Sequence, residues 1–184
     1  MRLYTGLVHY PVYNKNRQRI ASAITTFDLH DLARLARTYD VKRFFVITPL
    51  ADQQVLAERI RGHWTQGYGA RYNLHRKEAF ERVAVVSSLD RAIHAVAETE
   101  GARPLLIATD ASRQGSRSIG WEEARRIIRN EMGIILLFGT AWGLDTAVLQ
   151  RADYVLDPII GRGGYNHLSV RAAAAIILDR LAGR

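Results

Sequence analysis

Unbroken apolar runs alternate along this chain with segments of helical periodicity, and that alternation constrains the fold more than any other feature. The runs at 44–47 and 134–138 contain no polar residue, which is typical of strands covered on both faces. Strands are expected at 3–9, 43–48, 82–86, 104–109, 134–138 and 154–159, and helices near 28–39, 51–65, 89–100, 121–131, 143–150 and 168–182. The pattern predicts an α/β fold, a mostly parallel sheet of about six strands with helices on both faces.

Length and composition favour one domain over residues 1–184, because a chain of this size can pack helices on a single sheet. There is no run of about 18 or more apolar residues and no secretory leader, so a cytoplasmic location is expected. The absence of cysteine excludes disulfides and thiolate metal sites. The six histidines are scattered, and no metal site is indicated.

The formal net charge of +8 indicates a partner rich in phosphate, and nucleic acid fits best. After the first strand, tyrosines are interleaved with Asn, Lys and Arg, a combination that can stack a base and hold a phosphate. An ordinary surface loop is the alternative for this segment. The residues predicted to bind RNA are Tyr13, Asn14, Lys15, Arg17 and Arg37.

The helix expected at 28–39 has a clear amphipathic pattern. Asp28 is the predicted N-cap, and Asp31 is placed in the positive first turn. One apolar stripe is formed by Leu29, Leu32, Ala33, Ala36 and Tyr39. Arg34 lies nearly opposite the centre of that stripe, so it must meet solvent, a ligand or another subunit.

Two glycine-rich segments follow successive strands late in the chain, at 139–143 and 161–164. Such glycines let the backbone approach a ligand closely, and their succession favours one shared ligand. Neither the P-loop pattern nor a dinucleotide-binding fingerprint after the first strand is present. An enzyme acting on a small phosphorylated substrate, with phosphate held by these loops, is one alternative.

Three segments in this order resemble the motifs of the SPOUT superfamily of S-adenosylmethionine (SAM)-dependent RNA methyltransferases. In the first, Asp28 takes the place of the motif asparagine, Arg34 that of the motif arginine, and Asp40 that of the glycine. The second, an apolar strand followed by a glycine turn, is similar to residues 139–144 but is one residue shorter. It also lacks the motif glutamate, and Ala141 marks this departure.

The third motif is the most specific, and it resembles residues 158–178. Leu168-Ser169-Val170 and the alanine run that follows match it, whereas His167 stands where the motif has asparagine. Nearly the whole chain, including 7–15 and 28–39, is similar to a small bacterial subfamily made of a lone SPOUT domain. The resemblance implies a C-terminal trefoil knot, at about 104–184, which binds the cofactor in a bent form.

The resemblance also implies a homodimer formed through the region of the C-terminal helix. The sequence supports a second partner for this helix, because it is apolar on two sides. One side holds Leu168, Ala172, Ala175 and Ile176, and the other holds Val170, Ala174, Ile177 and Leu181. Arg34 would then act across the subunit interface.

The implied function is transfer of a methyl group from SAM to a nucleotide of structured RNA, either tRNA or rRNA. The expected cofactor-binding residues are Thr109, Phe138, Gly139, Thr140, Gly143, Ile160, Gly161, Tyr165, Leu168 and Ser169. The expected catalytic residues are Arg34, which orients the acceptor, and Asp28 or His167 as the general base, with Asp110 as a further candidate. A catalytically silent SPOUT-like protein that binds RNA or assists assembly is the other alternative, marked by the motif departures at Asp28, Ala141 and His167.

Overall fold

A single parallel sheet organises the chain. The structure is a computed structural model and describes residues 1–113, 115–129, 132–163 and 165–183, so Gly164 of the second glycine segment lies outside it. Within these residues all paired neighbours in the sheet are parallel. From edge to edge the order is β5 (Val83–Val86), β4 (Arg43–Ile47), β1 (Leu3–Val8), β8 (Ile134–Gly139), β6 (Leu105–Thr109), β9 (Tyr154–Leu156) and β7 (Ser118–Ile119).

The predicted α/β class is confirmed, and the sheet has seven strands where about six were expected. The additional strand, β7, is two residues long and lies at one edge. Strand β1 lies inside the sheet and pairs with β4 on one side and β8 on the other, so that Leu7 is paired with both Val46 and Phe138. The strand order therefore reverses between β1 and β8, and open parallel sheets bind ligands at the carboxyl ends of strands at such a point.

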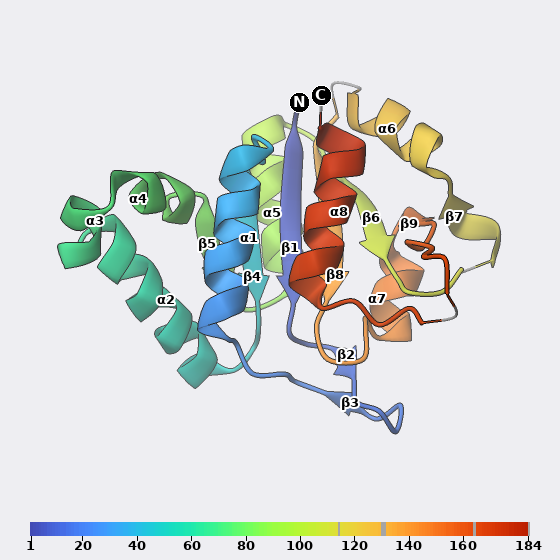
Figure 1. The fold of residues 1–184 in the computed structure, drawn as a ribbon, viewed down its shortest axis with the longest axis horizontal. Coiled ribbons are helices and arrows are strands. Elements are labelled where there is room, and N and C mark those ends of the chain that lie inside the picture. The colour runs from blue at the N-terminus through green and yellow to red at the C-terminus, as the bar shows by residue number, and fades with distance from the viewer. Residues whose placement is uncertain (114, 130–131, 164, 184) are drawn as a thin grey trace.

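Helices cover both faces of the sheet. Figure 1 shows α1 and α8 side by side over one face, with α5 behind the sheet. Apolar side chains of α1, α2, α4, α6 and α8 share one buried core, whereas those of α5 and α7 share the other. The helix bounds are α1 (Thr26–Thr38), α2 (Ala51–Thr65), α3 (Tyr68–Tyr72), α4 (Leu74–Phe80), α5 (Leu89–Glu100), α6 (Trp121–Arg129), α7 (Thr146–Arg151) and α8 (Val170–Ala182).

The start of α1 differs from the expected one. Thr25 is the N-cap, and its Oγ1 accepts a hydrogen bond from the Asp28 backbone N–H at 3.1 Å. The prediction that Asp28 is the N-cap was therefore wrong. The Asp28 carboxylate instead accepts the Thr25 hydroxyl at 2.6 Å, so the two residues satisfy each other across the first turn. Helix α1 thus begins earlier than expected, whereas the last helix begins later, because Ser169 caps it through the Ala172 N–H.

Several short elements were not predicted. The hairpin of β2 (Val12–Tyr13) and β3 (Arg19–Ile20) follows β1, a single 3-10 turn spans Gly115–Arg117, and α3 and α4 occupy the connection to β5. Each is too short for hydrophobic periodicity to reveal it. Among the helices of the described residues, none is both long and apolar enough to cross a membrane.

Candidate functional site

The hairpin after β1 is locked to the turn after β8. The Tyr13 backbone N–H donates to the Gly143 carbonyl at 3.0 Å, and the Trp142 N–H donates back to the Tyr13 carbonyl at 2.9 Å. The Tyr13 hydroxyl also lies 3.0 Å from Oγ1 of Thr146, the first residue of α7. The hairpin after β1 and the turn after β8 therefore form one hydrogen-bonded unit at the β1–β8 switch point.

The turn itself depends on glycine at both ends. A Cβ on Gly139 would stand 2.6 Å from the Leu144 backbone nitrogen, so only glycine allows the chain to fold back this tightly. Gly143 has a φ of +98°, and Ala141 between them has a φ of +51°, which is uncommon for a residue with a side chain. A Cβ on Gly143 would point toward Oδ2 of Asp110, at 4.0 Å. The turn after β8 therefore faces the loop after β6.

The segment after β9 completes the convergence. The Asn166 side-chain amide donates to the Ala111 carbonyl at 2.7 Å, which places this segment against the loop after β6. The His167 ring lies 6.1 Å from the Trp142 ring and 5.4 Å from that of Tyr165, measured between centroids. Both glycine-rich segments and the loop after β6 thus meet in one place, as the shared-ligand hypothesis requires.

The expected cofactor-binding residues divide into two groups in this place. Some side chains already have structural partners: Oγ1 of Thr109 donates to the Leu137 carbonyl, and Oγ1 of Thr140 donates to the Val8 carbonyl. Phe138 is buried in the core. Only backbone groups of these residues remain to face a ligand. The apolar and aromatic side chains that stand open to solvent are those of Ile160, Tyr165 and Leu168, and Ser169 is exposed as well.

A buried polar chain, which the sequence did not reveal, supports the turn. His9 follows β1 and is fully buried, with its Nδ1 3.0 Å from the Ser22 hydroxyl. Ser22 in turn lies 2.5 Å from Oγ1 of Thr140. Burial lowers the pKa of the His9 imidazole to about 4, although the Asp28 carboxylate opposes part of this shift. Nε2 of His9 has no hydrogen-bond partner within the part of the chain that the structure describes.

A second unforeseen pair ties β3 to α7. Asp145 caps α7, is 1% exposed, and receives two hydrogen bonds from the Arg19 guanidinium, at 2.9 and 3.1 Å. Burial alone would raise the pKa of this carboxyl. The hydrogen bonds from Arg19 and from the Ala147 N–H outweigh burial, and the pKa of Asp145 is lowered. The hairpin is therefore attached to the turn after β8 through Tyr13 on β2 and to the start of α7 through Arg19 on β3.

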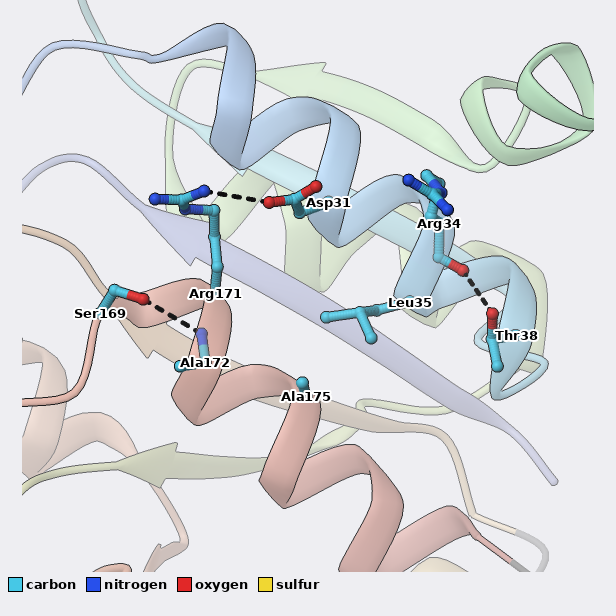
Figure 2. A pocket seen from close by; sticks show the side chains of 8 residues that line it. All are labelled: Asp31, Arg34, Leu35, Thr38, Ser169, Arg171, Ala172 and Ala175. Carbon is cyan, nitrogen blue, oxygen red and sulfur yellow. Dashed lines mark hydrogen bonds and ion pairs between the residues drawn. The ribbon is translucent and has the colours of Figure 1, made fainter. Parts of the chain in front are cut away.

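Arg34 lies at a hollow of about 480 Å³ between α1 and α8. Figure 2 shows its side chain directed away from α8, while Arg171 of α8 reaches across to Asp31. Arg171 is a residue that sequence reasoning missed: it binds Asp31 at 3.0 Å and Asp28 at 3.3 Å. Ser169, at the start of α8, lines the same hollow. Arg34 and Ser169 therefore border the same hollow, although the Arg34 side chain points away from Ser169.

The three expected catalytic residues do not form one cluster. Asp28 and Arg34 both belong to α1, and Asp28 is ion-paired with Arg171. His167 makes its ring contacts with Trp142 and Tyr165 instead. Asp110 lies beside the turn after β8. Its Oδ1 accepts the Ser112 N–H at 2.7 Å, and its Oδ2 is on the side of Gly143.

The residues expected to bind RNA are likewise divided. Oδ1 of Asn14 accepts the N–H groups of Asn16 and Gln18, so this side chain closes the hairpin loop. Lys15 and Arg17 are exposed at the tip of that loop. Arg37 lies elsewhere, on α1, where its guanidinium contacts Glu78 of α4 at 3.1 Å.

Comparison with known proteins agrees with this geometry. A family model described as SAM-dependent RNA methyltransferase matches residues 2–183. The chain belongs to this family. The resemblance noted in the sequence motifs is thereby confirmed, and with it SAM as the cofactor of the family and RNA as its substrate class.

Two relatives and one solved structure illustrate the likeness. A tRNA (guanine-N(1)-)-methyltransferase of Oleidesulfovibrio alaskensis is 44% identical over 98% of this chain, and the chain spans 42% of that relative's length. An uncharacterized protein of Aquifex aeolicus is 36% identical over 99% of this chain and 89% of its own. The A. aeolicus TrmH/SpoU tRNA modifying enzyme superposes with a TM-score of 0.58 at 14% identity, covering 98% of this chain and 74% of that one. This last likeness shows the SPOUT fold.

Proposed function

We propose that this chain transfers the methyl group of SAM to a nucleotide of structured RNA, a tRNA or an rRNA. The observation that carries the proposal is the convergence of the turn after β8, the loop after β6 and the segment after β9. It occurs at the switch point of the sheet in a chain whose family uses SAM. An RNA acceptor of this kind also favours the cytoplasm as the place of action.

The residues at this place fit the proposed cofactor. Gly139 and Gly143 leave backbone groups of the turn free of covering Cβ atoms. The open side chains of Ile160, Tyr165 and Leu168 offer an apolar surface for an adenine ring. We propose that they hold SAM together with backbone groups of Thr109, Phe138, Thr140 and Gly161 and with Ser169. When bound, SAM supplies a methyl group on a positively charged sulfur.

The chain's own residues then position the acceptor and accept its proton. We propose that Arg34 orients the acceptor or an adjacent phosphate, because its charge is exposed beside the hollow that Ser169 also lines. The general base is taken from Asp110, His167 and Asp28. Of these, Asp110 is favoured by its position facing the turn, whereas Arg171 already engages Asp28.

Two architectural features belong to the same proposal. The first is a homodimer through α8, whose side formed by Ala174, Ile177 and Leu181 is buried on its own sheet. Ala172 and Ala175 on its other side line the hollow and remain half-buried, as a surface awaiting a partner would be. A monomer at micromolar concentration in equilibrium sedimentation would contradict this feature.

The second feature is a trefoil knot at about 104–184, within one domain covering the whole chain. The contact of Asn166 with Ala111 supports the knot, because it brings the segment after β9 against the loop after β6. A crystal structure that traces this segment outside that loop would contradict the knot.

The test uses the full chain with methyl-labelled SAM and total RNA from a strain that lacks the gene. Label in RNA, followed by nucleoside analysis, is the expected result and identifies the modified atom. Guanine N1, the atom in the name of the O. alaskensis relative, is one of the positions that this assay resolves. Calorimetry with SAM separates the alternative: no binding at millimolar cofactor would favour the catalytically silent RNA-binding protein.

A further inference from the structure

A stretch between β4 and β5 is strongly basic and contains no acidic residue. Residues 59–77 include five Lys or Arg, two His, one Trp and two Tyr, without a single Asp or Glu. The basic residues are Arg59, Arg61, Arg71, Arg76 and Lys77. The acidic residues of α2 and α4, which are Asp52, Glu58 and Glu78, lie just outside this stretch. Figure 1 shows α2, α3 and α4 together at the end of the molecule away from α6 and β7.

Two tyrosines of this stretch are displayed to solvent. Tyr68 and Tyr72, one turn apart on α3, are 68% and 76% exposed. Their rings stack with centroids 5.8 Å apart and planes inclined by 18°. Leu74 beside them is also exposed. Large aromatic side chains gain free energy by burial, so this uncovered ring pair is available to pack against a partner.

The helix that carries these rings is held in a fixed position. A Cβ on Gly69 would stand 2.6 Å from the Trp64 ring and 2.8 Å from Nε2 of His63, so α3 packs directly on the end of α2. On its other side, Asn73 caps α4 by accepting the Arg76 N–H at 2.9 Å. The rings are thus presented by a supported helix, which reduces the ordering entropy that binding costs.

The basic stretch is also joined to α1, the helix of Arg34. The Arg76 guanidinium lies over the Trp64 ring at 4.8 Å and contacts Nδ1 of His30 on α1 at 3.2 Å. Arg37, one turn after Arg34, binds Glu78 of α4. The basic stretch is therefore packed next to the helix that carries Arg34.

We propose that Tyr68, Tyr72 and Arg71 form a docking surface for a single-stranded segment of RNA. Bases stack on the two rings, and the exposed Arg71 pairs with the phosphate backbone. Arg71 lies between the two tyrosines in the sequence, and residues 59–77 themselves carry no acidic side chain, which favours a polyanion over a second copy of this basic chain. The proposal rests on the proposed function, to which it adds an anchor for the substrate outside the glycine-rich loops.

The test compares RNA affinity across matched variants of the full chain. Binding of a fluorescent oligouridine and of total tRNA is measured by anisotropy for wild type, Tyr68→Ala/Tyr72→Ala and Tyr68→Phe/Tyr72→Phe. The alanine pair is expected to weaken binding about tenfold or more, because stacking is lost, while the phenylalanine pair retains it. Arg71→Ala is expected to lower the salt dependence of binding by about one phosphate contact.

Each other result has a definite meaning. If the alanine pair binds RNA as wild type does, the docking surface is wrong while the proposed methyl transfer stands. If the wild-type chain binds SAM but no RNA, both the surface and the RNA part of the proposed function are wrong. If the alanine pair instead changes the oligomeric state in light scattering with RNA affinity unchanged, the two tyrosines cover a second copy of the chain and the proposal fails.

Discussion

Polar and aromatic side chains have opposite roles in two regions of the molecule. One is the glycine-loop region, made of the loops that meet at the β1–β8 switch point, and the other is the α2–α4 end, made of helices α2, α3 and α4. In the glycine-loop region, Tyr13, Ser22 and Thr140 form hydrogen bonds with other parts of the protein. At the α2–α4 end, Tyr68 and Tyr72 contact each other and solvent. In the first region these side chains hold the backbone in its conformation, whereas in the second they form part of the outer surface. Substitutions should accordingly affect stability in one and binding in the other.

The strongest test of this contrast is Gly139→Ala. Because the added Cβ would lie 2.6 Å from backbone nitrogen and could not be relieved by a side-chain rotation, we expect a loss of about 3 kcal/mol of unfolding free energy. Urea denaturation measures it. The matched control is Gly163→Ala, whose added Cβ would meet open space, and it should change stability by less than about 0.5 kcal/mol. An equal loss of unfolding free energy in both variants would show that the turn after β8 has no special requirement for glycine at position 139.

Arg34→Ala probes a residue that lies between the two regions. Its side chain is exposed, so folding and SAM affinity should be preserved. We expect the rate of methyl transfer to fall about a hundredfold, because the acceptor is no longer held in place. Single-turnover transfer and calorimetry with SAM measure the two quantities separately. Wild-type turnover in this variant would exclude Arg34 from catalysis.

The buried His9 predicts a pH dependence that belongs to the glycine-loop region. With a folded-state pKa of about 4 and an unfolded value near 6.5, the unfolded chain takes up a proton first as the pH falls. The free energy of unfolding should therefore fall by about 2 kcal/mol as the pH is lowered from 7 to 5, because the buried imidazole stays neutral in the folded protein. His9→Asn should flatten this part of the curve of unfolding free energy against pH. An unchanged slope would show that His9 does not control it.

The smallest effect on stability is expected at the α2–α4 end. Tyr68→Ala/Tyr72→Ala removes two exposed rings, so the unfolding free energy should change by less than about 0.5 kcal/mol. Thermal and urea unfolding provide the measurement. A loss comparable to that of Gly139→Ala would mean that the ring pair stabilises the fold, and the contrast between the two regions would disappear.

The sequence predicted the strands and long helices well, because each carries a signal along the chain. The run at 134–138 reads as a strand covered on both faces, and it is β8. The stripe of Leu29, Leu32, Ala33 and Ala36 is the buried face of α1. What remained hidden were elements without a period, such as the five residues of α3.

The site was predictable only in part. The glycines at 139 and 143 indicated close backbone approach, which their geometry confirms. The Arg19–Asp145 pair joins positions 126 residues apart and follows from no local pattern. The first cap was misplaced because Thr25 and Asp28 each have a side chain that can accept a backbone N–H, and only the structure shows which one does.

The central position of β1 has a consequence for the order in which the protein folds. The hydrogen bond from Thr140 to Val8 closes a loop of 132 residues, whereas α2, α3 and α4 make most of their contacts with one another. Loop closure of this length is slow, so the helical end should acquire its structure early in refolding and the switch point late. Cofactor binding should therefore be the last property to return during refolding. In a stopped-flow experiment, its return would report that folding is complete.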